Sequence, residues 1–268
     1  MKEAIMSITM ITYDSFIPKL SWVDAVEALK KGHFLPKAEI KDLFLGPNTA
    51  TLVNRAAYVE GLGYGVKAVT VVEANAARHL PTVQGAMLFY KDQTGCLQAI
   101  IENRLITEVK TAADSVLGAR LLARKESKNL LIIGAGNLAS GVAHAYSAAF
   151  PGLEKISIWG RRPEQAQQLV QELAGLATPV EAVQDLAQAC QQADIISTVT
   201  MAREPVLKGE WVKAGTHIDL IGAYKPDMRE ADDALLQKGT LFVDSFDTTV
   251  HHIGELMIPL QAKVIAES

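Results

Sequence analysis

Short segments of small, apolar and β-branched residues recur through the first hundred positions, and turn residues separate them. Gly61 and Gly63 mark one turn. The stretch 92–95 marks another, between two strand-like segments, and this spacing predicts a hairpin. The predicted strands cover residues 51–59, 64–72, 83–90 and 96–101.

A helix is predicted before these strands, over residues 21–31. Ser21 is a typical N-terminal cap, apolar residues recur on one side of the segment, and Gly32 ends the pattern. Residues 37–45 mix polar and apolar positions and precede a turn at Gly46. One helix and mainly antiparallel strands together predict an α+β unit for the first part of the chain.

The second half of the chain alternates apolar strand-like runs with helical patterns, and a helix predicted over 107–124 leads into it. This alternation is typical of a parallel sheet with helices on both faces and right-handed crossovers. The expected strands are 129–133, 155–159, 179–183, 194–200, 216–222 and 240–244, and the expected helices are 142–150, 163–174, 185–192 and 228–237.

The most informative stretch is NLLIIGAGNLASG, which starts with a buried strand at 129–133 and continues into a helix. Gly134 allows the tight turn after the strand, Gly136 lets a pyrophosphate approach the backbone, and Ala139 lets the helix pack closely. An ordinary glycine turn is the alternative, but the position between strand and helix favours a dinucleotide site. The pattern predicts an α/β fold with a Rossmann-type doubly wound parallel sheet. The residues expected at the cofactor phosphates are Gly134, Gly136, Asn137 and Leu138.

The end of the second strand of such a fold distinguishes NAD from NADP, because an acidic residue there binds the ribose 2′-hydroxyl of NAD. Here that position is Gly160, followed by Arg161 and Arg162. Guanidinium groups pair with a 2′-phosphate in bidentate fashion. The alternative is two surface arginines before a helix. We therefore expect NADPH as the cofactor, with NADH possible.

The composition excludes several classes of protein. Among the 268 residues, 49% are hydrophobic and 21% charged, as in globular proteins. The net charge of −4 does not indicate binding to nucleic acid or to an anionic membrane. Cys96 and Cys190 lie far apart and form no disulfide framework. The first residues lack the apolar core of a signal peptide, and no segment has the length and apolarity of a membrane span. A cytoplasmic location is expected.

A series of short motifs runs from about Leu52 to the C-terminus: Gly65-Val66-Lys67, Leu80 to Gly85, Thr94-Gly95, Ile106-Thr107, Lys110 to Ala113, Gly134 to Gly136, Gly209 to Val212 and Gly222 to Glu230. Through these motifs, taken in this order, the chain resembles the ornithine cyclodeaminase and mu-crystallin family, which includes ketimine reductases and a type of alanine dehydrogenase. The resemblance implies a homodimer whose subunits pair strands. It also implies a substrate-binding and dimerisation domain over 1–112, to which 251–268 returns, and a Rossmann domain over 113–250.

Three departures from the family pattern are informative. Lys110 stands where the family usually has a carboxylate-binding arginine, and a lysine keeps the charge but loses the bidentate fork. Tyr224 stands where cyclodeaminases place a catalytic aspartate, two residues before Pro226. Family members usually continue for some tens of residues beyond the position of Ser268. We expect this last difference to affect the dimer.

The resemblance also implies roles for residues of the first domain. Lys67 matches the family's substrate lysine and is expected to bind the substrate carboxylate or supply a proton, although a snorkelling edge lysine is the alternative. Lys110 is a second carboxylate ligand or a helix-surface charge. Arg55 lies near the start of the family's active-site strand, and Thr82 offers a hydroxyl group.

Residues at the ends of later strands are expected at the nicotinamide, because a doubly wound fold binds ligands there. These are Thr200, Met201 and Gly222, and Tyr224 is expected to form a wall of the substrate pocket rather than to act on the imine. The adjacent residues His251 and His252 are not expected to bind metal, because neighbouring side chains point to different sides.

The leading hypothesis is NADPH-dependent reduction of a cyclic ketimine carboxylate, either Δ1-pyrroline-2-carboxylate to L-proline or Δ1-piperideine-2-carboxylate to L-pipecolate. It depends on the Arg161-Arg162 pair, the family lysines and the missing aspartate at Tyr224. Three alternatives remain: an ornithine cyclodeaminase with tightly held NAD, a mu-crystallin-like protein that binds NADPH and a small ligand, and an amino-acid dehydrogenase.

Overall fold

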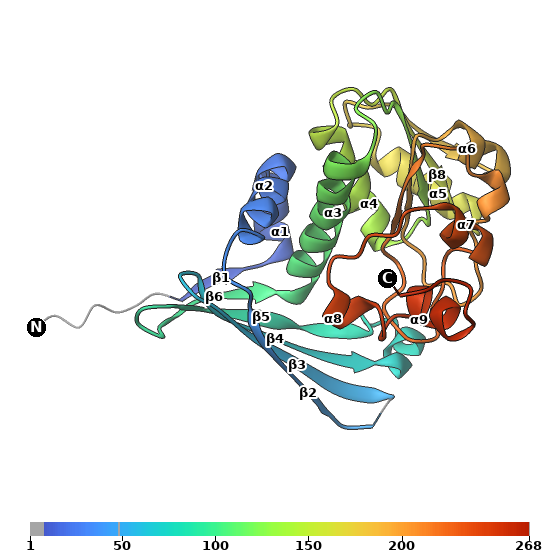
Figure 1. Cartoon of the computed structure of the whole chain (residues 1–268). Coiled ribbons are helices and arrows are strands. Elements are labelled where there is room, and N and C mark those ends of the chain that lie inside the picture. The colour runs from blue at the N-terminus through green and yellow to red at the C-terminus, as the bar shows by residue number, and fades with distance from the viewer. Residues whose placement is uncertain (1–7, 48, 268) are drawn as a thin grey trace, which may run out of the picture. The chain divides into compact units, whose positions relative to one another are not determined.

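The computed structural model describes residues 8–47 and 49–267, and the chain divides into two compact units at the boundary between Lys110 and Thr111 (Figure 1). Residues 251–267 belong to the second unit, in which Glu255 accepts hydrogen bonds from the backbone N–H groups of Glu230 and Ala231. The return of 251–268 to the first domain stays a prediction.

The first unit is built on a six-stranded sheet with the order β1-β6-β5-β4-β3-β2. Strands β2 to β6 form an antiparallel meander, and β1 pairs in parallel with β6. All four strands predicted in this part of the chain are confirmed, and β1 and β2 were not predicted. The strands are β1 (Thr9–Ile11), β2 (Glu39–Leu45), β3 (Ala50–Val59), β4 (Gly63–Val72), β5 (Val83–Lys91) and β6 (Leu97–Glu102).

Helices of the first unit lie on one face of this sheet, beside β1 and β6 (Figure 1). The Glu102 carboxylate accepts a hydrogen bond from the backbone N–H of Tyr13 at 2.7 Å, and the Arg104 guanidinium lies 3.7 Å from the centre of the Tyr13 ring. The predicted cap is confirmed, because the Ser21 hydroxyl accepts from the N–H of Asp24. The helices are α1 (Tyr13–Phe16), α2 (Trp22–Gly32) and the first residues of α3 (Asn103–Leu122), which continues into the second unit, with short 3-10 turns at Ile17–Lys19 and Glu73–Arg78.

The second unit contains a five-stranded parallel sheet with the order β11-β10-β7-β8-β9. The chain starts in the middle with β7, proceeds to one edge, and then returns to the other side of β7 with β10. This reversal defines a doubly wound fold, as predicted, and it places the ligand crevice at the carboxyl ends of β7 and β10. The strands are β7 (Asn129–Ile133), β8 (Lys155–Trp159), β9 (Val180–Val183), β10 (Ile195–Thr198) and β11 (His217–Leu220).

Two predictions for the second unit are wrong. The helix expected over 228–237 begins only at Asp233, because the preceding residues are extended and Leu207 forms a bridge with Ala231. The apolar run 240–244 is not a strand, since it forms no ladder with a neighbouring strand in the described part of the chain. The helices are α4 (Asn137–Ala149), α5 (Pro163–Glu172), α6 (Leu186–Gln192), α7 (Asp233–Lys238), α8 (Phe246–Thr249) and α9 (Gly254–Gln261), with a 3-10 turn at Gly209–Trp211.

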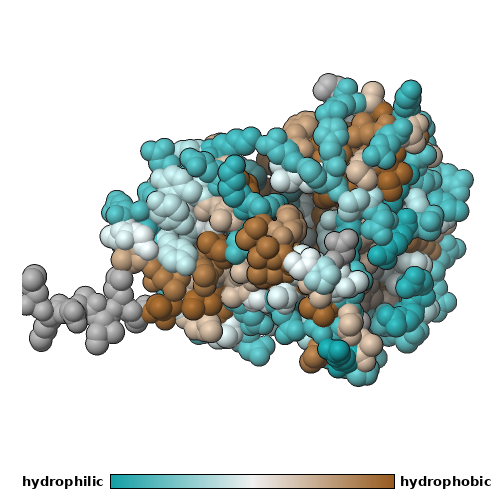
Figure 2. All heavy atoms as spheres, turned by 90° about the horizontal axis from the view of Figure 1, so that it is seen from below, coloured by the Kyte–Doolittle hydropathy of each residue, from teal (hydrophilic) through white to brown (hydrophobic). Residues whose placement is uncertain are grey.

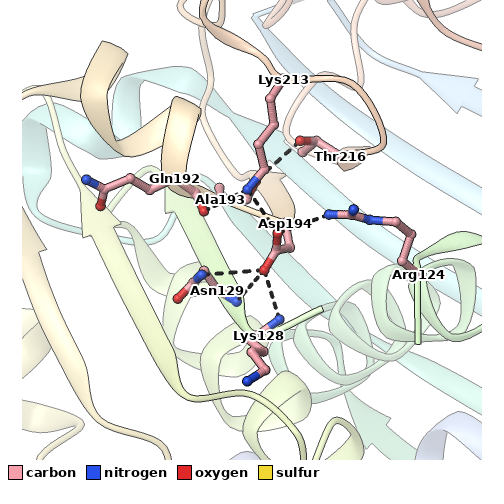
Figure 3. Close-up of polar contacts among 8 residues, drawn as sticks. All are labelled: Arg124, Lys128, Asn129, Gln192, Ala193, Asp194, Lys213 and Thr216. Atoms are coloured by element: carbon pink, nitrogen blue, oxygen red, sulfur yellow. Dashed lines mark hydrogen bonds and ion pairs between the residues drawn. The ribbon is translucent and has the colours of Figure 1, made fainter. Parts of the chain in front are cut away.

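A single carboxylate, Asp194, joins the amino ends of the parallel strands (Figure 3). One of its oxygens accepts from the backbone N–H groups of Lys128 at 3.0 Å and Asn129 at 3.1 Å. The other lies 3.1 Å from an Arg124 guanidinium nitrogen and 3.0 Å from the Lys213 ammonium. Burial opposes ionisation, but the Lys128 N–H and the Lys213 ammonium outweigh it and lower the pKa of Asp194. The amino edge of the sheet is thus fixed by the protein's own side chains.

Candidate functional site

The carboxyl edge of the parallel sheet is shaped by Gly134, directly after β7. Its φ is +121°, and a Cβ atom built on it would lie 2.9 Å from a Val199 methyl carbon and 3.0 Å from the Val199 carbonyl oxygen. Its N–H donates to the carbonyl of Trp159 at 2.8 Å. A side chain at this position would push the loop away from β10, so glycine is required by both conformation and space.

The turn continues into α4, which begins with Gly136 as its N-cap residue. No described atom lies within 4 Å of a Cβ built on Gly136, and no side chain in the described part of the chain caps this helix. Asn137 is exposed in the first turn and Ala139 is fully buried under it. Uncapped N–H groups and open space at a helix N-terminus fit the pyrophosphate of a dinucleotide.

The candidate residues for the ribose follow β8, the strand next to β7. Arg161 and Arg162 are both exposed, and the Arg162 guanidinium donates to the side-chain oxygen of Gln165 at 3.0 Å. Gly160 allows the loops after β7 and β8 to approach closely, because a Cβ on it would lie 3.2 Å from the Cβ of Ala135. Two cations therefore lie at the carboxyl end of β8, where the ribose of a bound dinucleotide is expected.

The candidate residues for the nicotinamide lie in the loops after β10 and β11. Met201 and Tyr224 expose 75% and 56% of their surface, so each presents its side chain outside the core. Thr200 and Gly222 each donate a backbone hydrogen bond to the same buried carboxylate, Glu230. Glu230 was not singled out from the sequence, although it closes the motif that starts at Gly222.

The first unit places its candidate residues in a row across the sheet. Arg55 of β3 lies opposite Lys67 of β4, and Lys67 lies opposite Met87 of β5. The Lys67 ammonium donates to the hydroxyl of Thr107 in α3 at 3.1 Å. Burial lowers the pKa of Lys67, and the charges of Lys110 and Arg55 lower it further. We call Arg55, Lys67 and Lys110 the cation cluster.

The members of the cation cluster differ in what they offer a ligand. The Nε–H and one terminal N–H of Arg55 donate to the Asp42 carboxylate, at 2.8 and 2.7 Å, so Asp42 already occupies one bidentate edge of this guanidinium. Lys67 is the half-buried member, and Lys110 is exposed in α3. The sequence did not indicate Asp42, and it indicated Thr107 only as part of a family motif, because the contacts of both residues follow from strand pairing and helix position.

Thr82 is not brought to the cation cluster. It precedes β5 and its carbonyl pairs with the N–H of Val72, whereas the partner of Lys67 in β5 is Met87. Five residues of extended chain separate Thr82 from Met87, which is about 16 Å at strand geometry.

Other features of the described residues concern metals, membranes and thiols. Within those residues, no group of three histidine, cysteine or acidic side chains could hold a metal ion. A ring nitrogen of His251 lies 3.3 Å from a carboxylate oxygen of Glu267. No helix in the described ranges is long and apolar enough to cross a membrane. Cys96 and Cys190 are both free thiols, and burial raises the pKa of Cys190 to about 12.

Comparison with known proteins gives consistent matches. The model of the ornithine cyclodeaminase/mu-crystallin family matches residues 49–267. A Δ1-pyrroline-2-carboxylate reductase of Paracoccus denitrificans is 58% identical over 259 residues, which cover 96% of this chain and 82% of that protein. The mouse ketimine reductase mu-crystallin is 35% identical over 72% of this chain, and the match spans only 60% of the mouse protein.

Solved structures show the same fold. The Thermococcus litoralis Δ1-pyrroline-2-carboxylate reductase, in complex with NADH and L-proline, superimposes with a TM-score of 0.85 at 28% identity, covering 96% of this chain and 82% of that one. A dimeric archaeal alanine dehydrogenase with bound NAD gives a TM-score of 0.86 at 27% identity, covering 97% of this chain and 81% of that one.

Proposed function

Because the chain belongs to the ornithine cyclodeaminase/mu-crystallin family, we propose that it is a nicotinamide-dependent oxidoreductase that reduces the C=N bond of a cyclic ketimine carboxylate. The observation that carries this proposal is the cation cluster, which provides positive charge for a carboxylate around a half-buried lysine. The preferred substrate is Δ1-pyrroline-2-carboxylate, giving L-proline, and the 58% identical relative bears the name of that reductase. The six-membered analogue, which gives L-pipecolate, is the second substrate.

Different residues of the chain have different roles in this proposed reaction. A bound nicotinamide supplies the hydride. Lys110 holds the substrate carboxylate by charge, while Thr107 fixes the direction of the Lys67 ammonium. Lys67 supplies the proton at the ring nitrogen, because its lowered pKa makes it a better proton donor than an ordinary lysine. Tyr224 forms part of the pocket wall.

The cofactor of this proposal is NADPH, with NADH accepted less well. Arg161 and Arg162 support a 2′-phosphate, and no acidic residue stands beside them after β8. The Thermococcus and archaeal neighbours are complexes with NADH and NAD, so the dinucleotide class is common to the fold. The preference between the two forms is the part that depends on this chain's arginines.

A homodimer in a reducing, cytoplasmic setting completes the proposal. Every residue of the edge strand β2 is exposed. Apolar side chains gather on the face of the six-stranded sheet turned away from α1 and α2 (Figure 2). Because side chains alternate along a strand, Met10, Leu43 and Tyr64 lie on the face opposite Lys67, and they are 67%, 52% and 43% exposed. An apolar face and an edge of this kind support pairing with a second copy.

The test is oxidation of NADPH, followed by its absorbance, with Δ1-pyrroline-2-carboxylate and then with NADH in place of NADPH. Turnover with both cofactors and a higher kcat/KM for NADPH is the expected result. Turnover that favours NADH would keep the reaction and overturn the role of Arg161 and Arg162. Ammonia release from ornithine, reduction of pyruvate with ammonia, or ligand binding without turnover would each replace the proposed reaction with one of the three alternatives.

A further inference from the structure

Glu230 is fully buried, and its carboxylate accepts four hydrogen bonds. One oxygen accepts from the backbone N–H and from the hydroxyl of Thr200, both at 2.7 Å. The other accepts from the Thr198 hydroxyl at 2.7 Å and from the backbone N–H of Gly222 at 2.8 Å. Four donors satisfy an ionised carboxylate, which accepts but does not donate. We call these four residues the Glu230 clamp.

The clamp lies where the pairing between β10 and β11 ends. The N–H of Ile221 still donates to the carbonyl of Thr198, at 3.2 Å. One residue further, the N–H of Gly222 turns to Glu230, and so does the N–H of Thr200 on the neighbouring strand. The carboxylate thus takes the place of a strand partner for the two loops expected at the nicotinamide.

The close packing around Glu230 explains why residue 222, in the loop after β11, is a glycine. A Cβ atom built on Gly222 would lie 2.1 Å from the carbonyl oxygen of Thr200 and 2.5 Å from a carboxylate oxygen of Glu230. Any side chain at position 222 would therefore separate the two loops. The close approach of backbone, carboxylate and glycine sets the spacing between the ends of β10 and β11.

The backbone of Glu230 is itself held on both sides. Its carbonyl accepts from the N–H groups of Val206 at 2.8 Å and Leu207 at 2.9 Å. Its N–H and that of Ala231 donate to the two oxygens of Glu255, at 2.5 and 3.0 Å. Hydrogen bonds within the protein itself thus hold the backbone that carries the Glu230 side chain.

We propose that Glu230 is a positioning residue for hydride transfer, which sets the two loops against which the nicotinamide lies without touching the substrate. This inference rests on the proposed function. Productive transfer depends on the distance between the reacting carbons, and a misplacement of about 1 Å lowers the rate by about a hundredfold. The cofactor phosphates bind elsewhere, at Gly134 and Gly136, so loss of the clamp affects the rate of the reaction more than the affinity for the dinucleotide.

The chain offers a matched control at the opposite edge of the same sheet. Asp194 is a partly buried carboxylate, and like Glu230 it joins strands through two backbone N–H groups and further side-chain donors. It lies at the amino ends, away from the carboxyl ends that bind ligands in this fold. A purely structural role for Glu230 would make Glu230→Gln and Asp194→Asn alike in their effects.

The experiment compares the two variants in the full chain, first without cofactor. Hydrogen exchange of the Thr200 and Gly222 amides is expected to be slow in the wild type and in Asp194→Asn, and about tenfold faster in Glu230→Gln. The fluorescence of bound NADPH, which reports immobilisation of the nicotinamide, should fall in Glu230→Gln alone. Equal exchange rates and equal fluorescence in both variants would overturn the proposal.

Kinetics with NADPH and Δ1-pyrroline-2-carboxylate then give the catalytic readout. Glu230→Gln is expected to lower kcat by about ten- to a hundredfold, to leave the KM for NADPH within about threefold, and to increase the kinetic isotope effect of NADPH deuterated at the transferred position. Asp194→Asn should retain kcat within about twofold. A kcat of Glu230→Gln equal to that of Asp194→Asn would contradict the positioning role.

Two further outcomes distinguish failure of the positioning role from misfolding of the variant and from failure of the proposed function. If Glu230→Gln does not fold, Thr198→Val, which removes a single donor from the clamp, should show the same changes at smaller size, and unchanged kinetics and exchange in that variant would overturn the proposal. If the wild type does not reduce the imine, the proposed function fails. The exchange and fluorescence measurements still decide whether the clamp sets the nicotinamide loops.

Discussion

The buried carboxyl group of Glu255 should make the stability of the second unit depend on pH. Glu255 is 5% exposed, and burial raises its pKa from 4.5 to about 7, although the backbone N–H groups of Glu230 and Ala231 act in the opposite direction. The charge of Glu230 raises it further. The unfolded chain releases this proton near pH 4.5, whereas the folded chain keeps it until about pH 7.

The sign and size of the effect follow from this difference. Between the two pKa values the folded state binds one more proton than the unfolded state, so the free energy of unfolding falls as pH rises. A pKa raised from 4.5 to about 7 corresponds to roughly 3.4 kcal/mol in total, of which roughly 2.5 kcal/mol is lost between about pH 5 and about pH 8. Glu255→Gln cannot lose this proton and gives up one acceptor, at a constant cost of about 1 kcal/mol.

The assay is urea unfolding at both pH values, followed by tryptophan fluorescence. Trp22 is replaced by Phe in the parent and in the variant, so that the signal comes from Trp159 and Trp211 of the second unit. The difference in free energy of unfolding between the parent and Glu255→Gln should change by roughly 2.5 kcal/mol from the lower to the higher pH. Burial lowers the pKa of His144 and so acts in the opposite direction, but it cancels in this difference. A difference that stays constant within about 0.5 kcal/mol would refute the reasoning.

Three other predictions follow from the same contacts. Asp194→Asn should lower the free energy of unfolding by about 1–3 kcal/mol in urea at neutral pH, and the loss should vanish as pH falls through the lowered pKa of Asp194. Replacing Arg161 and Arg162 by serine should lower kcat/KM for NADPH by about tenfold or more and leave the value for NADH within about twofold, measured in parallel assays. Lys67→Met should lower kcat for imine reduction by about a hundredfold while NADPH still binds, as measured by fluorescence titration.

Much of the fold could be predicted from the sequence because local signals agree with tertiary structure. Strand β8 coincides with the predicted 155–159, and β7 with 129–133, since each is a short apolar run followed by glycine. The edge strand β2 could not be predicted in this way. All its residues are exposed, so neither face shows the apolar pattern by which a strand is recognised.

The candidate site also combines residues that local sequence patterns predict with residues whose contacts depend on the folded structure. The positions of Gly134 and Gly136 between β7 and α4 were predictable, because this spacing is typical of a tight turn from a strand into a helix. The partner of Arg55 was not, since the Asp42 carboxylate reaches it only through the register of β2 against β3. Glu230 closes a family motif, but its role could not be predicted, because a glutamate is usually a surface residue and only the folded chain brings four donors to it.

The pairing of β1 with β6 has a consequence for the order in which the first unit forms. Thr9 pairs with Ala99, 90 residues later, whereas each of the strands β2 to β5 pairs with the next strand in the chain. Closing the long loop costs more chain entropy than closing a hairpin. During synthesis, β1 leaves the ribosome first but has no partner until β6 has followed. We expect the meander to form before β1 joins it, so that the earliest strand in the chain is the last to be added to its sheet.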